Sequence, residues 1–409
     1  MAWGAGNGKT LGVRVTSAGQ TTTYTYTYTV FKGVCVNGAA GVGQDTNAGT
    51  VLAPVASVQK GIDLVQSLYT TGEVHVAQRS TNPTLNQYSA SNIVAAMVEG
   101  ISLYGGYSLD FSVRNPAAYE TVLVDSSTNG GTTPFGTMSA TNQPNRAVYF
   151  PPGITSATVI DGFTVMPGSG NSNAAVSVCG GSPTIQNLKI TGAANPISGT
   201  GKYVIGIYVF DPNGAAHAAS PVIKNCVIDP GWTTAESDTT GNAIGVGLDN
   251  CAAPQVKSST ISGGHGYVTK AFSCRSDTAF LTTTTTIQGN SIDCGAAASV
   301  ATGLHYCIFF GPTIGVSITS NSFHNAGAAD THYAIYESRT QGSVAHSPAS
   351  VSSNTFSLSG FASGGTGGYY FDNNATAILD LTSNITLNTG TAVTDDTTTT
   401  LTAGGNIQN

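Results

Sequence analysis

A short apolar pattern recurs along the chain from about residue 157 to residue 385. In each copy an apolar residue returns five places after the first, with Asn, Ser or Gly between the two. The clearest copies are Ser182–Ile190, Ser220–Ile228 and Ala253–Ile261. An earlier copy and three looser ones are Ile160–Val165, Ile287–Ile292, Ile318–Phe323 and Val351–Phe356.

The first apolar residues of these copies are spaced by 25 to 38 residues. Such a period, with inserts of variable length, is typical of a solenoid, whose units bury their apolar faces only by stacking on neighbours. The apolar residues form short β-branched runs without helical spacing, and a second run precedes most copies, as in Ile205–Val209. Two or three short strands per turn predict a parallel β-helix. An α-solenoid needs long periodic runs, and a propeller blade is longer.

The region before the repeats predicts a cap for the solenoid. Val58, Ile62, Val65 and Leu68 fall on one face at helical spacing, and Ser57 can cap the helix start. Strands are expected over residues 72–77 and 100–107, and long loops over 109–150. Because a solenoid must cover its open end, we expect the helix over residues 57–68 to lie there.

The order of this helix, Glu73–Ala77, Ile101–Tyr107, Ile160–Val165 and the Ser-Pro repeats resembles secreted right-handed parallel β-helix proteins of bacterial surfaces, in the pectate-lyase-like β-solenoid superfamily. The resemblance covers about residues 50 to 390. It implies an all-β, right-handed parallel β-helix with a short N-terminal capping helix and terminal strand arms. The superfamily holds polysaccharide lyases, hydrolases, adhesins, tail spikes and structural proteins, so the resemblance does not select a function.

The expected organisation has three parts. Residues 1–45 form an N-terminal Thr/Tyr strand arm, residues 46–390 form the parallel β-helix with its cap, and residues 391–409 form a C-terminal strand or tail.

Strict alternation of Thr and Tyr over residues 21–30 predicts a strand. One interpretation is a first strand paired at the end of the solenoid. A second is an arm that pairs with the open edge of another subunit, in which case the assembly residues are Tyr24, Tyr26, Tyr28 and Val30. An ice-binding threonine array is a third interpretation, which the absence of the pattern on successive coils disfavours.

The composition of the chain argues against some classes of binding partner. Charged residues make up 9% of the chain, against a usual value of about 25%. A net charge of −7 and the absence of a basic run argue against nucleic acid. No apolar run is long enough to span a membrane, and the N-terminus lacks the apolar core of a signal peptide. The resemblance nevertheless implies an extracellular or cell-surface protein.

Cysteine and asparagine positions give two structural hypotheses. The seven cysteines form no CxxC pair, so we expect neither a zinc site nor a cofactor. Cys226 is expected in the core, and Cys251 and Cys274 lie where they can bridge neighbouring coils. Asparagines recur near one turn of each coil and predict an inward, hydrogen-bonded stack, namely Asn187, Asn225, Asn290, Asn321 and Asn354.

In enzymes of the resembled superfamily, sugar chains lie along one sheet, and paired acids or an Arg/Lys base do the chemistry. Asp249 and Asp277 align at equivalent ends of successive coils, and Lys270 and Arg275 lie on nearby strands, so these four are the catalytic candidates. His305 and Glu337 accompany them. The alternative is that these residues cap turns or line a solvated face. The sequence has no pair of acids within one strand and no Asp-rich calcium loop, so these two signs of an enzyme are missing.

The leading functional hypothesis is an extracellular structural β-solenoid that self-associates, as the subunit of a surface filament. Its motivation is the uncharged Gly/Thr/Ser/Asn-rich composition and the Tyr/Thr arm, since a head-to-tail contact does not close and gives fibres. One alternative is a polysaccharide lyase or glycoside hydrolase. Another is a glycan-binding adhesin or phage receptor-binding spike, whose expected exposed aromatic residues are Tyr208, Tyr306, Tyr336 and Tyr370.

Overall fold

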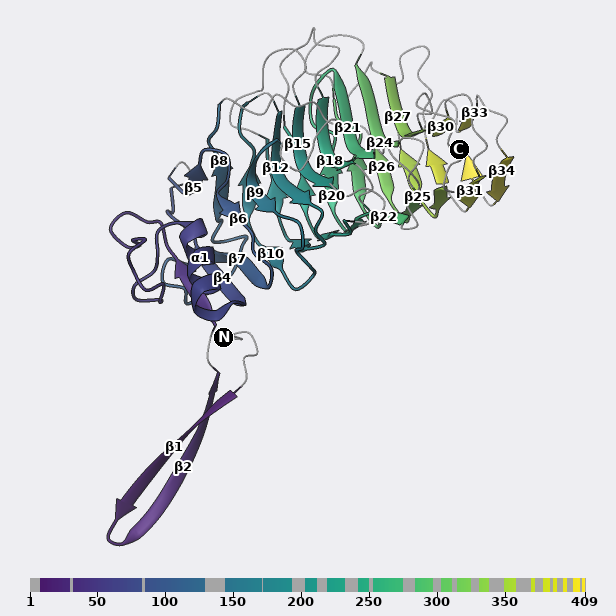
Figure 1. Ribbon diagram of the computed structural model, residues 1–409. Coiled ribbons are helices and arrows are strands. Elements are labelled where there is room, and N and C mark those ends of the chain that lie inside the picture. Colours follow the sequence, from purple (N-terminus) through teal and green to yellow (C-terminus); the bar gives the residue numbers. More distant parts are fainter. Residues whose placement is uncertain are drawn as a thin grey trace.

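The computed structural model describes residues 8–29, 32–82, 85–128, 144–170, 172–192, 203–211, 219–231, 242–249, 253–274, 284–296, 303–310, 315–324, 331–337, 349–357, 369–371, 378–382, 385–387, 393–395, 400–404 and 407–408. Three long parallel sheets dominate these residues and wrap around one common core (Figure 1).

The first sheet has twelve strands, in the order β3 (Gly33–Val36), β4 (Gly72–Ala77), β7 (Ile101–Tyr107), β10 (Val159–Asp161), β13 (Thr184–Gln186), β16 (Val222–Lys224), β19 (Gln255–Lys257), β22 (Thr284–Gln288), β25 (Gly315–Thr319), β28 (Ala349–Ser352), β31 (Ile378–Thr382) and β34 (Thr400–Gly404). The second sheet has eleven, in the order β5 (Gln87–Ala90), β8 (Val122–Asp125), β11 (Thr164–Met166), β14 (Lys189–Ile190), β17 (Val227–Ile228), β20 (Thr260–Ser262), β23 (Ser291–Asp293), β26 (Ser322–His324), β29 (Thr355–Ser357), β32 (Ile385–Leu387) and β35 (Ile407–Gln408).

The third sheet has ten strands, in the order β6 (Ala95–Ala96), β9 (Asn145–Phe150), β12 (Ser172–Cys179), β15 (Tyr203–Phe210), β18 (Asn242–Asp249), β21 (Val268–Cys274), β24 (Leu304–Phe310), β27 (Thr331–Glu337), β30 (Tyr369–Phe371) and β33 (Val393–Asp395). Each coil visits the three sheets in turn, and each strand pairs in parallel with its equivalent in the next coil. The chain is therefore a right-handed parallel β-helix, as expected from its sequence.

The repeated apolar pattern marks the residues that fill the solenoid. The first apolar residue of each copy points inward from the first sheet and the second points inward from the second sheet, so both are buried in one core cluster. The first column is Ile160, Ile185, Ile223, Val256, Ile287, Ile318 and Val351, and the second is Val165, Ile190, Ile228, Ile261, Ile292 and Phe323. Burying each such side chain contributes about 1.5–3 kcal/mol, which explains why this pair is the strongest signal in the sequence.

Between these two columns every coil turns through one residue with positive φ. These residues are Gly162, Asn187, Asn225, Ser258, Gly289, Ser320 and Ser353, with φ between 49° and 79°. Gly, Asn and small polar residues tolerate this left-handed conformation best. The residue that follows points inward and is buried, as Leu188, Cys226 and Asn290 show.

The predicted asparagine stack is correct for three of its five members. Asn290, Asn321 and Asn354 occupy the inward position of the turn. The Asn321 Oδ1 atom accepts hydrogen bonds from the Asn290 main-chain N–H (2.9 Å) and Nδ2 (3.0 Å), and Asn354 Oδ1 accepts the equivalent pair from Asn321. Each side-chain amide also donates to a backbone carbonyl, as Asn321 Nδ2 does to Ile287 (2.9 Å).

Asn187 and Asn225 are the exceptions. They occupy the preceding, left-handed position and are exposed, because Leu188 and Cys226 fill the inward place in their coils. The sequence contains Asn at both turn positions for two different physical reasons, namely tolerance of positive φ and satisfaction of buried backbone groups.

Helix α1 (Val58–Tyr69) caps the N-terminal end of the solenoid, as predicted (Figure 1). Ser57 is its N-cap and accepts a hydrogen bond from the Lys60 main-chain N–H. Val58, Ile62 and Val65 are buried, but Leu68 is 56% exposed. The prediction placed Leu68 on the buried face. It lies on the flank of that face, beyond the width of the first coil.

The Thr/Tyr segment forms a β-hairpin of its own. β1 (Gly8–Ser17) and β2 (Gln20–Thr29) pair antiparallel along ten residues each, around a turn at Ala18 and Gly19, both of which have positive φ. The hairpin extends away from the solenoid beside α1 and β4 (Figure 1), and its two strands form a separate sheet. It is therefore not the first strand of the solenoid.

Strands also occupy places where the sequence suggested arms or loops. β3 lies within residues 1–45 but is the edge strand of the first sheet, and β33, β34 and β35 continue the three sheets beyond residue 391. The segment 109–150, expected to be loops, contains β8 and β9. Among the described residues, no helix is long and apolar enough to cross a bilayer.

The asparagine stack makes a prediction about stability. Replacing Asn321 by Ala (N321A) removes the acceptor of the buried Asn290 main-chain N–H and the amide that donates to Ile287 and Asn354. A buried group left without a partner costs about 1–3 kcal/mol. We expect urea denaturation to show a clear fall in the unfolding midpoint for N321A. The matched variant S322A, which changes the adjacent exposed residue, should unfold like the native protein; an equal loss in both variants would contradict the role of the stack.

Candidate functional site

Asp249, the first catalytic candidate, is buried at the end of β18. The Tyr208 hydroxyl lies 3.3 Å from its Oδ2 atom, and Tyr208 itself is fully buried. Burial and, second, the nearby Asp249 charge raise the pKa of Tyr208 well above its usual value, so the phenol remains protonated. Asp249 is thus held in a buried contact with the Tyr208 hydroxyl on the outer side of the third sheet.

Lys270, the second candidate, lies on β21 and is half-buried. Its Nζ atom stands 4.2 Å from the centre of the Phe309 ring and 6.0 Å from that of Tyr306. An ammonium over aromatic faces is a cation–π contact, which holds the Lys270 side chain against the aromatic rings. Asp277 and Arg275 lie outside the described residues, so the predicted group of four is not brought together by the described part of the structure.

His305 is also held inside the protein, on β24. The Thr269 hydroxyl lies 2.6 Å from His305 Nδ1 and 2.6 Å from the carbonyl oxygen of Cys294. Because the hydroxyl has one proton and donates it to the carbonyl, His305 Nδ1 must carry a proton and donate to Thr269. This arrangement joins neighbouring coils and buries the imidazole. The side chain of Glu337 lies outside the described residues.

Four aromatic side chains form a cluster on the outer side of the third sheet, which we call the aromatic cluster: Tyr306, Phe309, Tyr333 and Tyr336. Tyr306 stacks on Tyr333 with ring centres 5.4 Å apart, and Phe309 stacks on Tyr336 at 5.5 Å. The two stacks meet edge-on, with Tyr306 and Tyr336 5.1 Å apart. Tyr306 is buried and the other three are half-buried.

The sequence identified two of these residues, Tyr306 and Tyr336, but expected both to be exposed. Tyr208, also expected on the surface, belongs to a separate buried cluster with Ile205 and Ile244. The side chain of Tyr370 lies outside the described residues. Phe309 and Tyr333 were missed, although their spacing from Tyr306 and Tyr336 matches the parallel register of β24 and β27.

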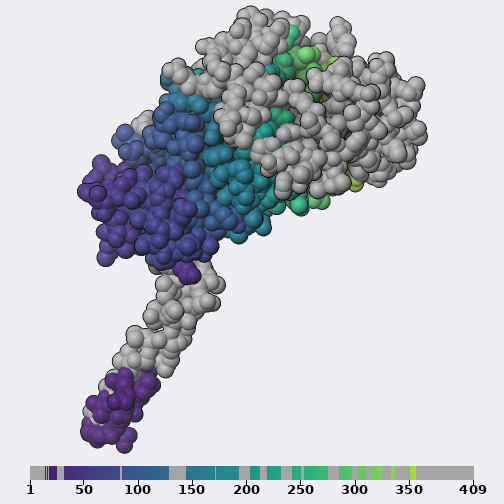
Figure 2. Space-filling model, in the orientation of Figure 1, coloured from purple at the N-terminus to yellow at the C-terminus, as the bar shows by residue number. Residues whose placement is uncertain are grey.

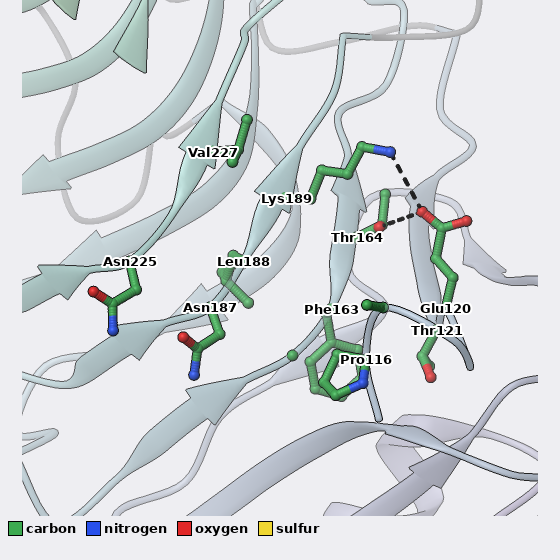
Figure 3. A pocket seen from close by; sticks show the side chains of 12 residues that line it. Pro116, Glu120, Thr121, Phe163, Thr164, Asn187, Leu188, Lys189, Asn225 and Val227 are labelled. Carbon is green, nitrogen blue, oxygen red and sulfur yellow. Dashed lines mark hydrogen bonds and ion pairs between the residues drawn. The ribbon is translucent and has the colours of Figure 1, made fainter. Parts of the chain in front are cut away.

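A hollow of about 480 Å³ opens over the turn between the first and second sheets (Figure 3). The residues after β7 form one wall, with Pro116 and Glu120, and the next coils contribute Lys189, Asn225 and Val227. The Glu120 carboxylate accepts a hydrogen bond from the Thr164 hydroxyl (2.7 Å) and lies 3.7 Å from Lys189 Nζ.

The hollow contains one carboxylate. The nearest equivalent on the first sheet, Asp161, is engaged by Arg114 Nη2 (2.9 Å), Gln186 Nε2 (2.8 Å) and Asn187 Nδ2 (3.0 Å). Glycoside hydrolysis needs a second acid facing the first across the bond. The arrangement therefore supplies polar groups for contact with a ligand and does not form a pair of catalytic acids.

Cysteine placement differs from the expected bridge. Cys294, after β23, forms a disulfide with Cys307 on β24. Cys274 is free and buried, so it does not bridge to Cys251, which lies outside the described residues. Cys226 is buried in the core, as predicted. Within the described ranges, no three or more His, Cys, Asp or Glu side chains are placed to hold a metal ion.

The assembly residues of the arm are placed in part. Tyr24 lies on β2 and is 51% exposed. The side chains of Tyr26 and Tyr28, and the whole of Val30, lie outside the described residues. The register pairs Leu11 with Tyr26 and Val13 with Tyr24, so alternation gives the hairpin one apolar and aromatic face. The alternate positions of β2 are threonines.

Few known proteins resemble this chain in sequence or structure. No family model matches the sequence, and no curated protein matches it. Among solved structures, the chain is similar to Escherichia coli YbhC, with 12% identity and a TM-score of 0.42 over 91% of this chain and 84% of that one. It is also similar to PfbA, a surface adhesin of Streptococcus pneumoniae, with 10% identity and a TM-score of 0.28 over 86% and 85%.

The three parallel sheets themselves give the chain the right-handed parallel β-helix fold that its repeats predicted. Its function must be argued from the chain's own residues.

The free cysteines give a prediction about reactivity. Burial raises the pKa of the Cys35, Cys226 and Cys274 thiols to about 12, so none of these three forms a reactive thiolate near neutral pH. We expect iodoacetamide at pH 8 to leave all three unmodified in the native protein and to alkylate them in urea, as mass spectrometry of the peptides would show. Rapid native alkylation of any of the three would contradict the described core.

Proposed function

We propose that the protein is an extracellular structural β-solenoid whose copies associate through the N-terminal hairpin, and that it serves as the subunit of a surface filament. The observation that carries the proposal is the hairpin itself. Within the described residues, β1 and β2 pair with each other and with no strand of the solenoid.

A two-stranded hairpin is marginally stable in water by itself. Each of its strands also presents a row of backbone N–H and C=O groups to any strand that approaches. Pairing with a sheet edge of another copy would satisfy these groups, and it would cover the aromatic face that contains Tyr24. The hairpin is therefore suited to add its strands to a sheet edge of another copy. Threonines, which carry hydroxyl groups, occupy its other face.

The remaining composition suits a subunit that packs against its own copies. Few charges need to be desolvated, because only 9% of the residues are charged. The Cys294–Cys307 disulfide supports an oxidising, extracellular location. In the proposed contact, the arm at one end of the solenoid pairs with a sheet edge of the next copy. Such a contact is heterologous and can repeat from copy to copy into a filament.

The arm makes the central prediction. Removing residues 1–30 deletes the hairpin but keeps β3, which the first sheet needs at its edge. We expect the native chain to form filaments in negative-stain micrographs and the shortened chain to give separate rods. Circular dichroism should show the same solenoid in both. Rods or small discrete oligomers from both chains would contradict the proposal.

A point variant separates the faces of the arm. Tyr24→Glu places a charge on the aromatic face, whereas Thr23→Glu places the same charge on the threonine face, and both native residues are exposed. Only the first should weaken association in sedimentation velocity experiments.

Glycan binding is a second candidate function, favoured by the aromatic cluster. The C–H-rich face of a sugar ring packs on aromatic side chains, and polar groups at their edges fix its orientation. Phe309, Tyr333 and Tyr336 supply half-buried rings at successive rungs of the third sheet. This function is compatible with assembly, because the cluster lies far along the solenoid from the arm (Figure 1).

A glycan array tests this second function. Binding to any glycan should fall about two- to tenfold on Tyr336→Ala, because one aromatic stacking contact contributes roughly 0.5–1.5 kcal/mol. Tyr119→Ala, which changes a half-buried tyrosine away from the cluster, should leave binding unchanged. Equal binding by both variants would place any glycan site elsewhere.

A further inference from the structure

Exposed apolar side chains gather at the N-terminal cap of the solenoid. Leu52 is 97% exposed, Leu68 56%, Val42 47% and Val51 44%. With Leu64, which is half-buried, these residues form what we call the cap patch. In the rest of the described solenoid, the large apolar residues that are exposed are Leu85, Leu109, Val113 and Val227. A single exposed apolar residue needs no explanation, but a group of this size marks an interaction surface.

The patch runs from the loop before α1 onto the flank of that helix. Thr50 and Ala53 exchange backbone hydrogen bonds (3.1 and 3.2 Å), which places Val51 and Leu52 at the tip of a tight turn. Gly49, at the base of this turn, abuts the helix: a Cβ atom there would stand 3.4 Å from Leu64 Cδ1. Leu68 follows Leu64 by one helical turn on the same flank.

Among the described residues, no apolar side chain covers Leu52, which is 97% exposed. The backbone of the loop is well anchored, since the Asn47 side chain donates to the Pro54 carbonyl (2.8 Å) and the Gln44 N–H donates to the same oxygen (3.2 Å). The turn is thus held in a defined position that presents Leu52 to the outside. Leu52 is therefore exposed on a turn whose backbone is held in place by hydrogen bonds.

The arm begins directly beside this surface. β2 ends at Thr29 and β3 begins at Gly33, so the base of the hairpin is within about 14 Å of the first sheet's edge strand. β3 packs under α1, as the Gly61 position shows: a Cβ atom there would stand 2.6 Å from Val36 Cγ2. Figure 2 shows the tip of the arm projecting from the cap end of the solenoid, so a partner held by the arm lies at that end.

Charge also favours another copy as the occupant. The cap segment, residues 32–70, contains two lysines and two aspartates, namely Lys32, Lys60, Asp45 and Asp63. It is neutral, although the whole chain has a net charge of −7. Two molecules of the same negative charge repel least where one of them presents a neutral, apolar surface.

We infer that the cap patch is buried against the same second copy that the arm binds, so that arm and cap form one composite interface. This inference rests on the proposed self-association. The arm supplies backbone pairing, and the patch supplies the apolar contact that stabilises it once the partner is in place.

The test compares two pairs of exposed residues in the full-length chain. The variant L52D/L68D adds charge to the cap patch, and the matched variant V227D/S322D adds the same charge to exposed residues on later coils. Light scattering over a concentration series would measure the concentration at which copies associate. We expect L52D/L68D to raise it about tenfold or more and V227D/S322D to leave it near the native value.

The milder variant L52S controls for folding, because a residue 97% exposed makes almost no contact within its own chain. It should associate less readily than the native chain while melting at the same temperature. If the arm deletion abolishes association but L52D/L68D and L52S associate like the native chain, the cap inference is overturned and the arm proposal stands. If the native chain remains monomeric at every concentration, both are overturned.

Discussion

Every coil described between Ile160 and Val351 passes from the first to the second sheet through a single left-handed residue, and the register of the solenoid depends on that turn. The main-chain N–H of this residue donates to the next coil, as Asn187 does to the Lys224 carbonyl and Asn225 to the Lys257 carbonyl (3.2 Å each). A turn of fixed length keeps two inward apolar residues five positions apart in each coil. A longer turn would shift one of the two sheets by a residue and point its apolar side chains outward.

Because this turn is constant, length variation is confined to the other corners of the coil. The coils differ by up to 13 residues in the spacing of their first apolar positions, which run from 25 to 38. That is why the repeats predicted the architecture well: the apolar pair and the left-handed Gly, Asn or Ser are both dictated locally. The same local rule misled the assignment of asparagines, since Asn187 and Asn225 satisfy backbone conformation, whereas Asn290 and Asn321 satisfy buried backbone groups.

The site was less predictable because its members come from different coils. Phe309 and Tyr336 are 27 residues apart in sequence, yet stack at 5.5 Å. Their alignment depends on the lengths of the segments on either side of the repeat copy Ile318–Phe323, and these lengths follow no pattern in the sequence. The burial of Tyr208 could not be predicted from the sequence either. Its place in the alternation of β15 points its side chain outward, but there a second buried cluster covers the outer side of the third sheet. The β1 strand, by contrast, was open to prediction, since Leu11, Val13 and Val15 alternate before Ala18 and Gly19.

A solenoid satisfies its backbone and its apolar faces by stacking, so its sides need no partner and its first coil is where the stacking rule fails. Helix α1 covers the apolar end of the first coil with Val58, Ile62 and Val65. A twelve-residue helix has one such face, and the loop that leads into it must turn over the end of the core. The apolar side chains of that loop then have no coil to pack on. The loop and helix that close the core therefore leave apolar side chains exposed at the end of the solenoid from which the arm extends, and this is the end at which the proposed contact with a second copy forms.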